Sequence, residues 1–259
     1  MASEISLPFI IGGALIDSIS PFLIGVMVLL LTVLSRSNNR KIMLKHGLLY
    51  VLGVYVMYLV GGIILLQFFL IMKGVVALSN FLYILIGFLT IFFSLLQIKD
   101  YFWYGRWYSL SISPRFALTT ENIIKNITAH TFSSFHLGAI VTLMELISTG
   151  APYLAVVTLL SYTGDHYLNL VYLLLYNLIF VLPLIVILHL AYKGKSLKKI
   201  EKWRAKNRAL ARLIMGIFLI GMGVFIIVLV NLEIALLTGF LSMIIVGFMF
   251  ALKKLNIIA

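Results

Sequence analysis

The sequence predicts an all-α protein whose chain crosses a membrane about seven times. Of its 259 residues, 63% are hydrophobic and only 11% are charged, and the mean hydropathy is +1.14. A soluble domain of this size could not bury so much apolar surface. The apolar residues also gather in continuous runs, each long enough for the ~20 residues that a helix needs to cross a bilayer. Composition and run length together define a polytopic membrane protein.

Seven spans are expected, and two of them are interrupted. The predicted spans are residues 8–34, 46–72, 79–98, 137–161, 168–192, 210–230 and 234–252. Polar residues and helix breakers interrupt the first and the fourth. We predict one membrane domain at residues 1–230, followed by an additional helix and a basic tail at 231–259. Within that domain, halves at about 8–98 and 137–230 are joined by a linker, 99–136, expected to hold an amphipathic helix on the cytoplasmic face.

The net charge of +12 reports topology rather than a nucleic-acid partner. All basic residues except Lys73 fall in alternate connections or in the C-terminal tail. The positive-inside rule then places the N-terminus outside and the C-terminus in the cytoplasm. The expected surroundings of these basic residues are the lipid bilayer and its anionic headgroups.

The chain contains no cysteine, which excludes thiol redox chemistry and thiolate metal ligation by its own residues. None of its histidines shows the i, i+4 spacing of a helical metal site. We therefore expect neither a metal nor a cofactor.

The two interrupted spans carry the candidate functional residues. Asp17 to Pro21 breaks the first span, and Glu145 to Pro152 breaks the fourth. A charge at the centre of a membrane helix costs at least ~2.5–3.5 kcal/mol, so such residues are functional candidates. The predicted midplane binding or coupling residues are Asp17, Ser20, Pro21, Phe22, Glu145, Ser148, Thr149, Gly150 and Pro152.

The two breaks resemble each other, which predicts an inverted repeat. Each has an acid three residues before a serine, followed by a helix breaker. Three spans separate the two breaks, so the two interrupted helices enter the membrane from opposite sides. Transporters built from inverted repeats place their binding site where such broken helices meet. The alternative is a pair of kinked helices whose hydroxyls only satisfy freed backbone groups.

Asp17 and Glu145 have three possible roles. They could bind a cation, carry a proton, or remain neutral and hydrogen-bonded to the broken backbone. The sequence does not separate these roles.

Residues 145–155, from Glu145 to Ala155, resemble a motif of the CcdA/DsbD transmembrane family, the thiol–disulfide electron carriers of cytochrome c biogenesis. The family motif reads Glu-Leu-Pro-Cys-Thr-Gly-Gly-Pro-Tyr-Leu-Ala. Residues 17–25 look like the partner motif of that family, and the resemblance extends over about residues 8–230. It implies a fold of two inverted three-helix halves.

The reactive cysteines of that family would fall at Phe22 and Ser148, which cannot exchange disulfides. The resemblance therefore implies a member that is not an enzyme by itself. The favoured function is transport of a small solute or ion through the midplane site, by analogy with LysE-type exporters. The alternative is a structural or assembly role in cytochrome maturation, beside a thiol-bearing partner protein.

Overall fold

A computed structural model describes residues 2–35, 39–104, 132–163 and 166–255 of the chain. All regular structure in these ranges is α-helical. The helices are α1 (Ala2–Asp17), α2 (Pro21–Ser35), α3 (Arg40–Met72), α4 (Val76–Phe102), α6 (Ser133–Thr149), α7 (Ala151–Thr163), α8 (His166–Tyr192), α9 (Leu197–Val228) and α10 (Leu232–Lys254).

The helices account for the predicted membrane spans. Five segments are long and apolar enough to cross a membrane: α3, α4, α10, most of α8 and the part of α9 from Ala205. The pairs α1–α2 and α6–α7 each pass the same test together, and they are bent by 46° and 80° at short breaks. Counting each bent pair as one span gives up to seven. The protein is thus an integral membrane protein with an all-helical fold.

The helix ends follow local rules. Asn39 caps α3 by accepting hydrogen bonds from the backbone N–H groups of Lys41 and Ile42, and Asn231 caps α10 in the same way. After α8 the chain turns at Gly194, whose φ of +76° favours glycine. Helix α4 continues to Phe102, beyond the predicted end of the third span. The amphipathic helix predicted in the linker falls outside the described residues.

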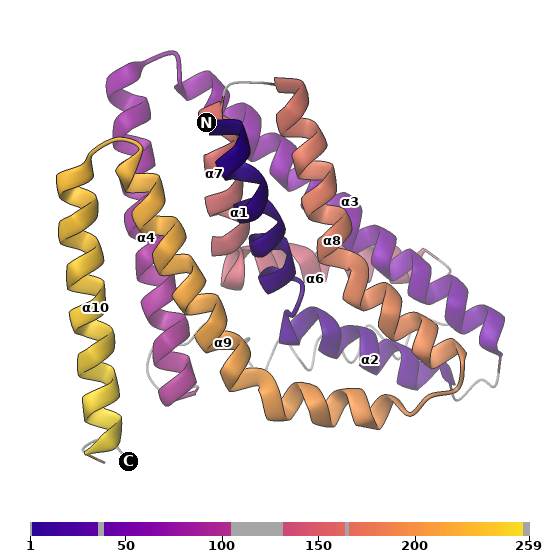
Figure 1. Cartoon of the computed structure of the whole chain (residues 1–259). Helices are drawn as coiled ribbons and strands as arrows, with labels where there is room; N and C mark the ends of the chain where they lie inside the picture. The colour runs from indigo at the N-terminus through magenta and orange to yellow at the C-terminus, as the bar shows by residue number, and fades with distance from the viewer. Residues whose placement is uncertain (1, 36–38, 105–131, 164–165, 256–259) are drawn as a thin grey trace.

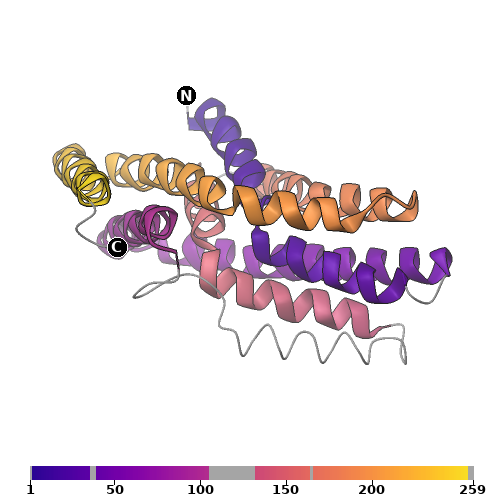
Figure 2. The same cartoon turned by 90° about the horizontal axis from the view of Figure 1, so that it is seen from below.

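One helix of each bent pair, α1 and α7, occupies the middle of the molecule. In Figure 1, α1 and α7 lie between a group formed by α3 and α8 and a group formed by α4, α9 and α10. Helix α2 runs across the lower end, and Figure 2 shows it surrounded by α3, α6, α8 and α9. Helix α10 packs only at the edge, on α9 and α4, and much of its apolar surface is exposed. That surface faces lipid in an integral membrane protein.

Glycines bring two helix pairs into close contact. A Cβ atom added at Gly53 of α3 would meet the backbone of Phe135 in α6, and one at Gly138 would meet the backbone of Tyr50. Gly87 of α4 and Gly223 of α9 approach each other's carbonyl oxygens in the same manner. Small residues at such crossings are typical of membrane helix packing. The inverted repeat itself stays a prediction.

Candidate functional site

The first break lies between α1 and α2. Helix α1 ends at Asp17, and Ser20 occupies the N-cap position of α2. The Ser20 side-chain oxygen accepts from the backbone N–H groups of Phe22 (3.3 Å) and Leu23 (3.4 Å). Proline is favoured at the first helical position, which Pro21 occupies, because its missing N–H would have no partner there. The sequence Ser-Pro therefore ends one helix and starts another within the span.

The second break lies between α6 and α7. Pro152 has no N–H to donate to the carbonyl four residues earlier, so a continuous helix through this position is disfavoured. Helix α6 ends at Thr149, Gly150 follows it, and α7 begins at Ala151. A Cβ atom at Gly150 would collide with the backbone of Leu146. Only glycine fits this bend of 80° without a shift of the chain.

The two breaks meet through one hydrogen bond. The Ser20 hydroxyl donates to Oε1 of Glu145 over 2.6 Å. Both side chains are almost fully buried, with 1% of each exposed. A hydroxyl-to-carboxyl bond of this length is strong when the carboxyl is charged. Ser20 thus ties the start of α2 to the last turns of α6.

Asp17 ends α1, on the other side of the first break from Ser20, and is fully buried. Its Oδ2 atom accepts hydrogen bonds from Tyr176 (2.9 Å) and from Tyr58 (3.4 Å). Among the described residues, no donor reaches its other oxygen, Oδ1. A buried carboxyl oxygen without a donor is suited to carry a proton or to contact a cation. We call Asp17, Ser20, Glu145, Tyr58 and Tyr176 the acid centre.

Two further polar side chains, Tyr153 and Asn177, lie next to the acid centre. The Tyr153 hydroxyl donates to the backbone oxygen of Tyr58 over 2.6 Å, and its ring packs on those of Tyr58 and Tyr176, with centroid distances of 4.9 and 5.1 Å. The Asn177 amide donates to the Leu173 carbonyl and, at 3.5 Å, to the Tyr153 hydroxyl. The buried phenol groups therefore form one connected layer around Asp17.

The structure brings together some of the predicted site residues. Asp17, Ser20, Glu145, Gly150 and Pro152 are all buried at the two breaks.

Phe22 is half-buried and packs against the main core. The side chains of Pro21, Ser148 and Thr149 lie outside the described residues. Within the described ranges, no group of three or more His, Asp or Glu side chains could hold a metal ion.

Three tyrosines near the acids were not among the predicted site residues. Tyr58, Tyr153 and Tyr176 stand inside apolar runs, where a phenol needs a hydrogen-bond partner once it is buried. A buried acid in the same membrane domain is such a partner. The sequence therefore indicates that buried tyrosines and buried acids could form hydrogen bonds with each other. It does not indicate which tyrosine contacts which acid.

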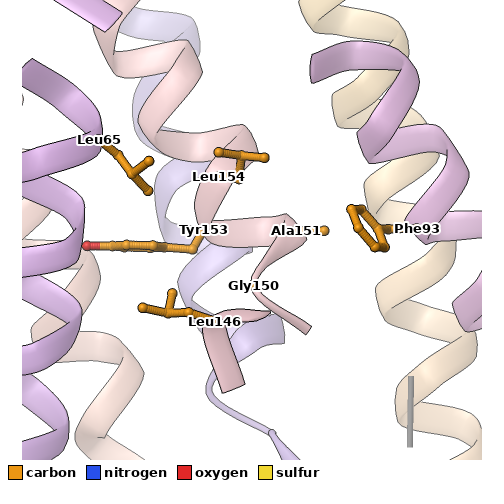
Figure 3. A pocket seen from close by; sticks show the side chains of 7 residues that line it. All are labelled: Leu65, Phe93, Leu146, Gly150, Ala151, Tyr153 and Leu154. Carbon is orange, nitrogen blue, oxygen red and sulfur yellow. The ribbon is translucent and has the colours of Figure 1, made fainter. Parts of the chain in front are cut away.

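A small apolar pocket lies beside the second break, and we call it the lateral pocket. Its volume is about 150 Å³. Leu65 of α3 and Phe93 of α4 approach it from opposite sides, and the first turn of α7 lies between them (Figure 3). Leu146, the residue after Glu145, also lines it. The pocket and the acid centre therefore share the same helix break.

Fold and geometry together define the class: an integral membrane protein of apolar helices, in which two bent helix pairs meet at buried acids. A family model described as Sap, sulfolipid-1-addressing protein (SfLAP) matches residues 10–229, which include both breaks. The chain belongs to this family. No curated protein and no solved structure matches it.

The family match overturns the resemblance to the CcdA/DsbD family. That assignment was wrong, and the expectations for cytochrome c biogenesis and a thiol-bearing partner lose their basis. The resemblance was carried by residues 145–155, with Glu145, Gly150 and Pro152 at the break itself. Glycine and proline are common at breaks in membrane helices, so they do not distinguish one family from another. Phe22 and Ser148 are accordingly not positions of lost cysteines.

Proposed function

We propose that the protein is a transporter that moves an amphipathic, lipid-like molecule, with Asp17 and Glu145 carrying the coupling protons. The observation that carries the proposal is the buried hydrogen bond between Ser20 and Glu145, which joins the two helix breaks. The description of the family as sulfolipid-1-addressing supports a lipid cargo. Broken helices in the two halves of a transporter are the usual location of substrate and ion sites.

The geometry supplies a way for a proton to move a helix. Ser20 both caps α2 and donates to Glu145. A hydrogen bond to a carboxylate is about twice as strong as one to a neutral group. Protonation of Glu145 therefore weakens the link between α2 and α6, and deprotonation restores it. Asp17, held by Tyr176 on α8, gives the opposite side of the break a second proton carrier.

An inverted repeat fits this proposal. Each half, 8–98 and 137–230, opens with a bent helix pair whose acid precedes the break. The final helix, in 231–259, stands outside the repeat. Alternating access would then tilt the two bent pairs against each other around the acid centre. The N-terminus lies outside and the C-terminus in the cytoplasm, as the charge distribution favours.

A lipid-transfer assay tests the function. The full chain is reconstituted into liposomes holding a fluorescent phospholipid and a fluorescent sulfated glycolipid in separate samples, with and without an imposed pH gradient. We expect the wild type to transfer at least one probe faster than protein-free liposomes, and the gradient to change the rate. Glu145→Gln and Asp17→Asn should transfer no faster than protein-free liposomes.

The matched control is Glu233→Gln, because Glu233 is an exposed acid in the first turn of α10. This variant should keep the wild-type rate. Equal rates for the wild type and protein-free liposomes with both probes would overturn the proposal. So would full gradient-dependent transfer by Glu145→Gln.

The orientation is tested separately. Because the chain has no cysteine, single cysteines report their own location. Val76→Cys, at an exposed position, should react with a membrane-impermeant maleimide in intact cells. Lys253→Cys should react only after permeabilisation. The reverse pattern would contradict the proposed orientation.

A further inference from the structure

The lateral pocket lies between α3 and α4, against the first turn of α7. These two helices, although consecutive in the chain, touch each other only sparsely. Within about one helical turn of Leu65 on α3 and of Phe93 on α4, large apolar side chains are exposed: Ile64, Phe68, Leu89 and Phe92. In a membrane-spanning bundle such side chains face lipid tails. Both helices that line the pocket therefore carry lipid-facing residues close to it in sequence.

The size and lining of the pocket select hydrocarbon. An apolar cavity of about 150 Å³ stays dry and accepts a group the size of benzene. The lateral pocket has that volume, and its walls come largely from Leu65, Phe93, Leu146, Ala151 and Leu154. An ion or a sugar would lose its hydration there without compensation. A short stretch of an acyl chain fits both the volume and the chemistry.

Tyr153 separates the pocket from the acid centre. Its side chain points toward α3, between Leu65 and Leu146, as Figure 3 shows. Its hydroxyl is held by the Tyr58 backbone. On the far side, its ring packs against Tyr58 and Tyr176, the two residues that donate to Asp17. One aromatic ring thus touches both the apolar pocket and the groups that hold the buried acid.

We propose that the lateral pocket binds one acyl chain of a membrane lipid, which enters sideways between α3 and α4, and that Tyr153 transmits its presence to Asp17. The binding step stands on the pocket alone, whereas the transmission step rests on the proposed proton-coupled transport. An inserted chain presses on the Tyr153 ring and displaces the Tyr58–Tyr176 pair. The hydrogen bonds to Asp17 then change, so lipid entry and proton binding become linked. Tyr153 is a positioning residue in this scheme.

Acyl-chain binding is measured by photolabelling. The full chain in liposomes is irradiated with a phospholipid carrying a diazirine in the middle of one acyl chain, and labelled peptides are identified by mass spectrometry. We expect label on the first turn of α7 and around Phe93. Leu154→Trp fills the pocket and should lower this label about tenfold. Leu236→Trp, at an exposed position on α10, should leave it unchanged.

A second variant that fills the pocket from another helix controls for misfolding of the first. Leu65→Trp fills the pocket from α3 and should also remove the label. Equal labelling in both blocked variants and the wild type would overturn the binding site. So would label spread evenly over the lipid-facing helices.

The proposed effect of Tyr153 on Asp17 is tested by measuring how lipid transfer depends on pH. Tyr153→Phe keeps the ring but loses the bond to the Tyr58 backbone. It should retain the photolabel and shift the pH of half-maximal transfer. An unchanged profile would refute the role of Tyr153. Photolabelling without transfer by the wild type would leave the pocket standing and reject the transport function, whereas transfer without labelling would reject the pocket alone.

Discussion

The Ser20 hydroxyl lies 2.6 Å from Oε1 of Glu145, across 125 residues of sequence, and it links the two helix breaks at a buried position. The same oxygen caps α2. One small side chain therefore holds a helix start and a membrane-embedded acid together. The stability of this link is open to direct measurement.

Ser20→Ala should destabilise the protein. It removes the N-cap, worth about 1 kcal/mol, and it also removes the buried hydrogen bond to Oε1 of Glu145, which costs about 1–3 kcal/mol. The readout is the thermal unfolding midpoint in detergent. Ser20→Thr should recover most of the loss, because it keeps the hydroxyl. Ser18→Ala is the matched control, since the Ser18 hydroxyl donates to the Leu15 carbonyl of the preceding helix α1 and does not cap α2. An equal loss in both alanine variants would contradict the prediction.

Tyr176 and Asp17 should be energetically coupled. Tyr176→Phe removes the 2.9 Å donor to Asp17 but keeps the ring. In a double-mutant cycle with Asp17→Asn, the coupling energy should be about 1–3 kcal/mol, measured as differences in unfolding free energy. Tyr172→Phe, on the same helix, should show no coupling to Asp17, because its hydroxyl forms no hydrogen bond with another described residue. Additive effects of Tyr176→Phe and Asp17→Asn would show that the contact contributes nothing.

The helix breaks could be predicted from the sequence because proline and glycine act locally. Pro21 and Pro152 each lack a donor, and Gly150 has no Cβ, so the positions of the breaks follow from neighbouring residues. The acids could also be predicted as functional candidates, since their cost in a membrane is a property of the residue.

The partners of the acids could not be predicted in the same way. Tyr58 and Tyr176 reach Asp17 from α3 and α8, and this choice depends on how those helices cross. The lateral pocket likewise arises because α3 and α4 diverge, which no local pattern encodes. The family assignment failed for a related reason, because glycine and proline at a helix break follow from backbone geometry and do not identify a family.

The glycine crossing of α3 and α6 should be intolerant of a methyl group. Gly53→Ala and Gly138→Ala each direct a Cβ at backbone atoms of the facing helix. Backbone cannot rotate away as a side chain can, so each variant should lose about 1–3 kcal/mol of stability.

Gly221→Ala and Gly247→Ala are the controls for this crossing. An added Cβ meets no described atom within 4 Å at either position, and alanine favours a helix interior by roughly 0.5–1 kcal/mol. The unfolding midpoints of the two controls should therefore be unchanged or higher than that of the wild type. The midpoints of Gly53→Ala and Gly138→Ala should be lower. Equal midpoints for Gly53→Ala and Gly221→Ala would show that α3 and α6 separate freely.

A buried ionic cluster holds the C-terminal end of α4 against the middle of α9. Arg212 donates from Nη1 to Asp100 (2.8 Å) and to Gln97 (2.9 Å), while Lys99 pairs with the other carboxyl oxygen of Asp100. Asp100 is fully buried, and Arg212 is 7% exposed. Breaking a buried ion pair from one side costs about 3–5 kcal/mol, because the remaining charge stays buried.

Arg212→Ala should therefore cost about 3 kcal/mol, toward the low end of that range, since Lys99 still faces Asp100. Asp100→Asn should cost more, because it leaves two buried cations facing a neutral amide. Arg208→Ala, one turn earlier on α9, removes an exposed cation that stacks 3.6 Å from the centroid of the Tyr104 ring; its cost should stay below about 1 kcal/mol. The wild type and these three variants are compared by thermal unfolding in the same detergent. If Arg212→Ala loses no more stability than Arg208→Ala, water reaches the ionic cluster. The packing of α4 on α9 would then depend on their glycine contacts instead.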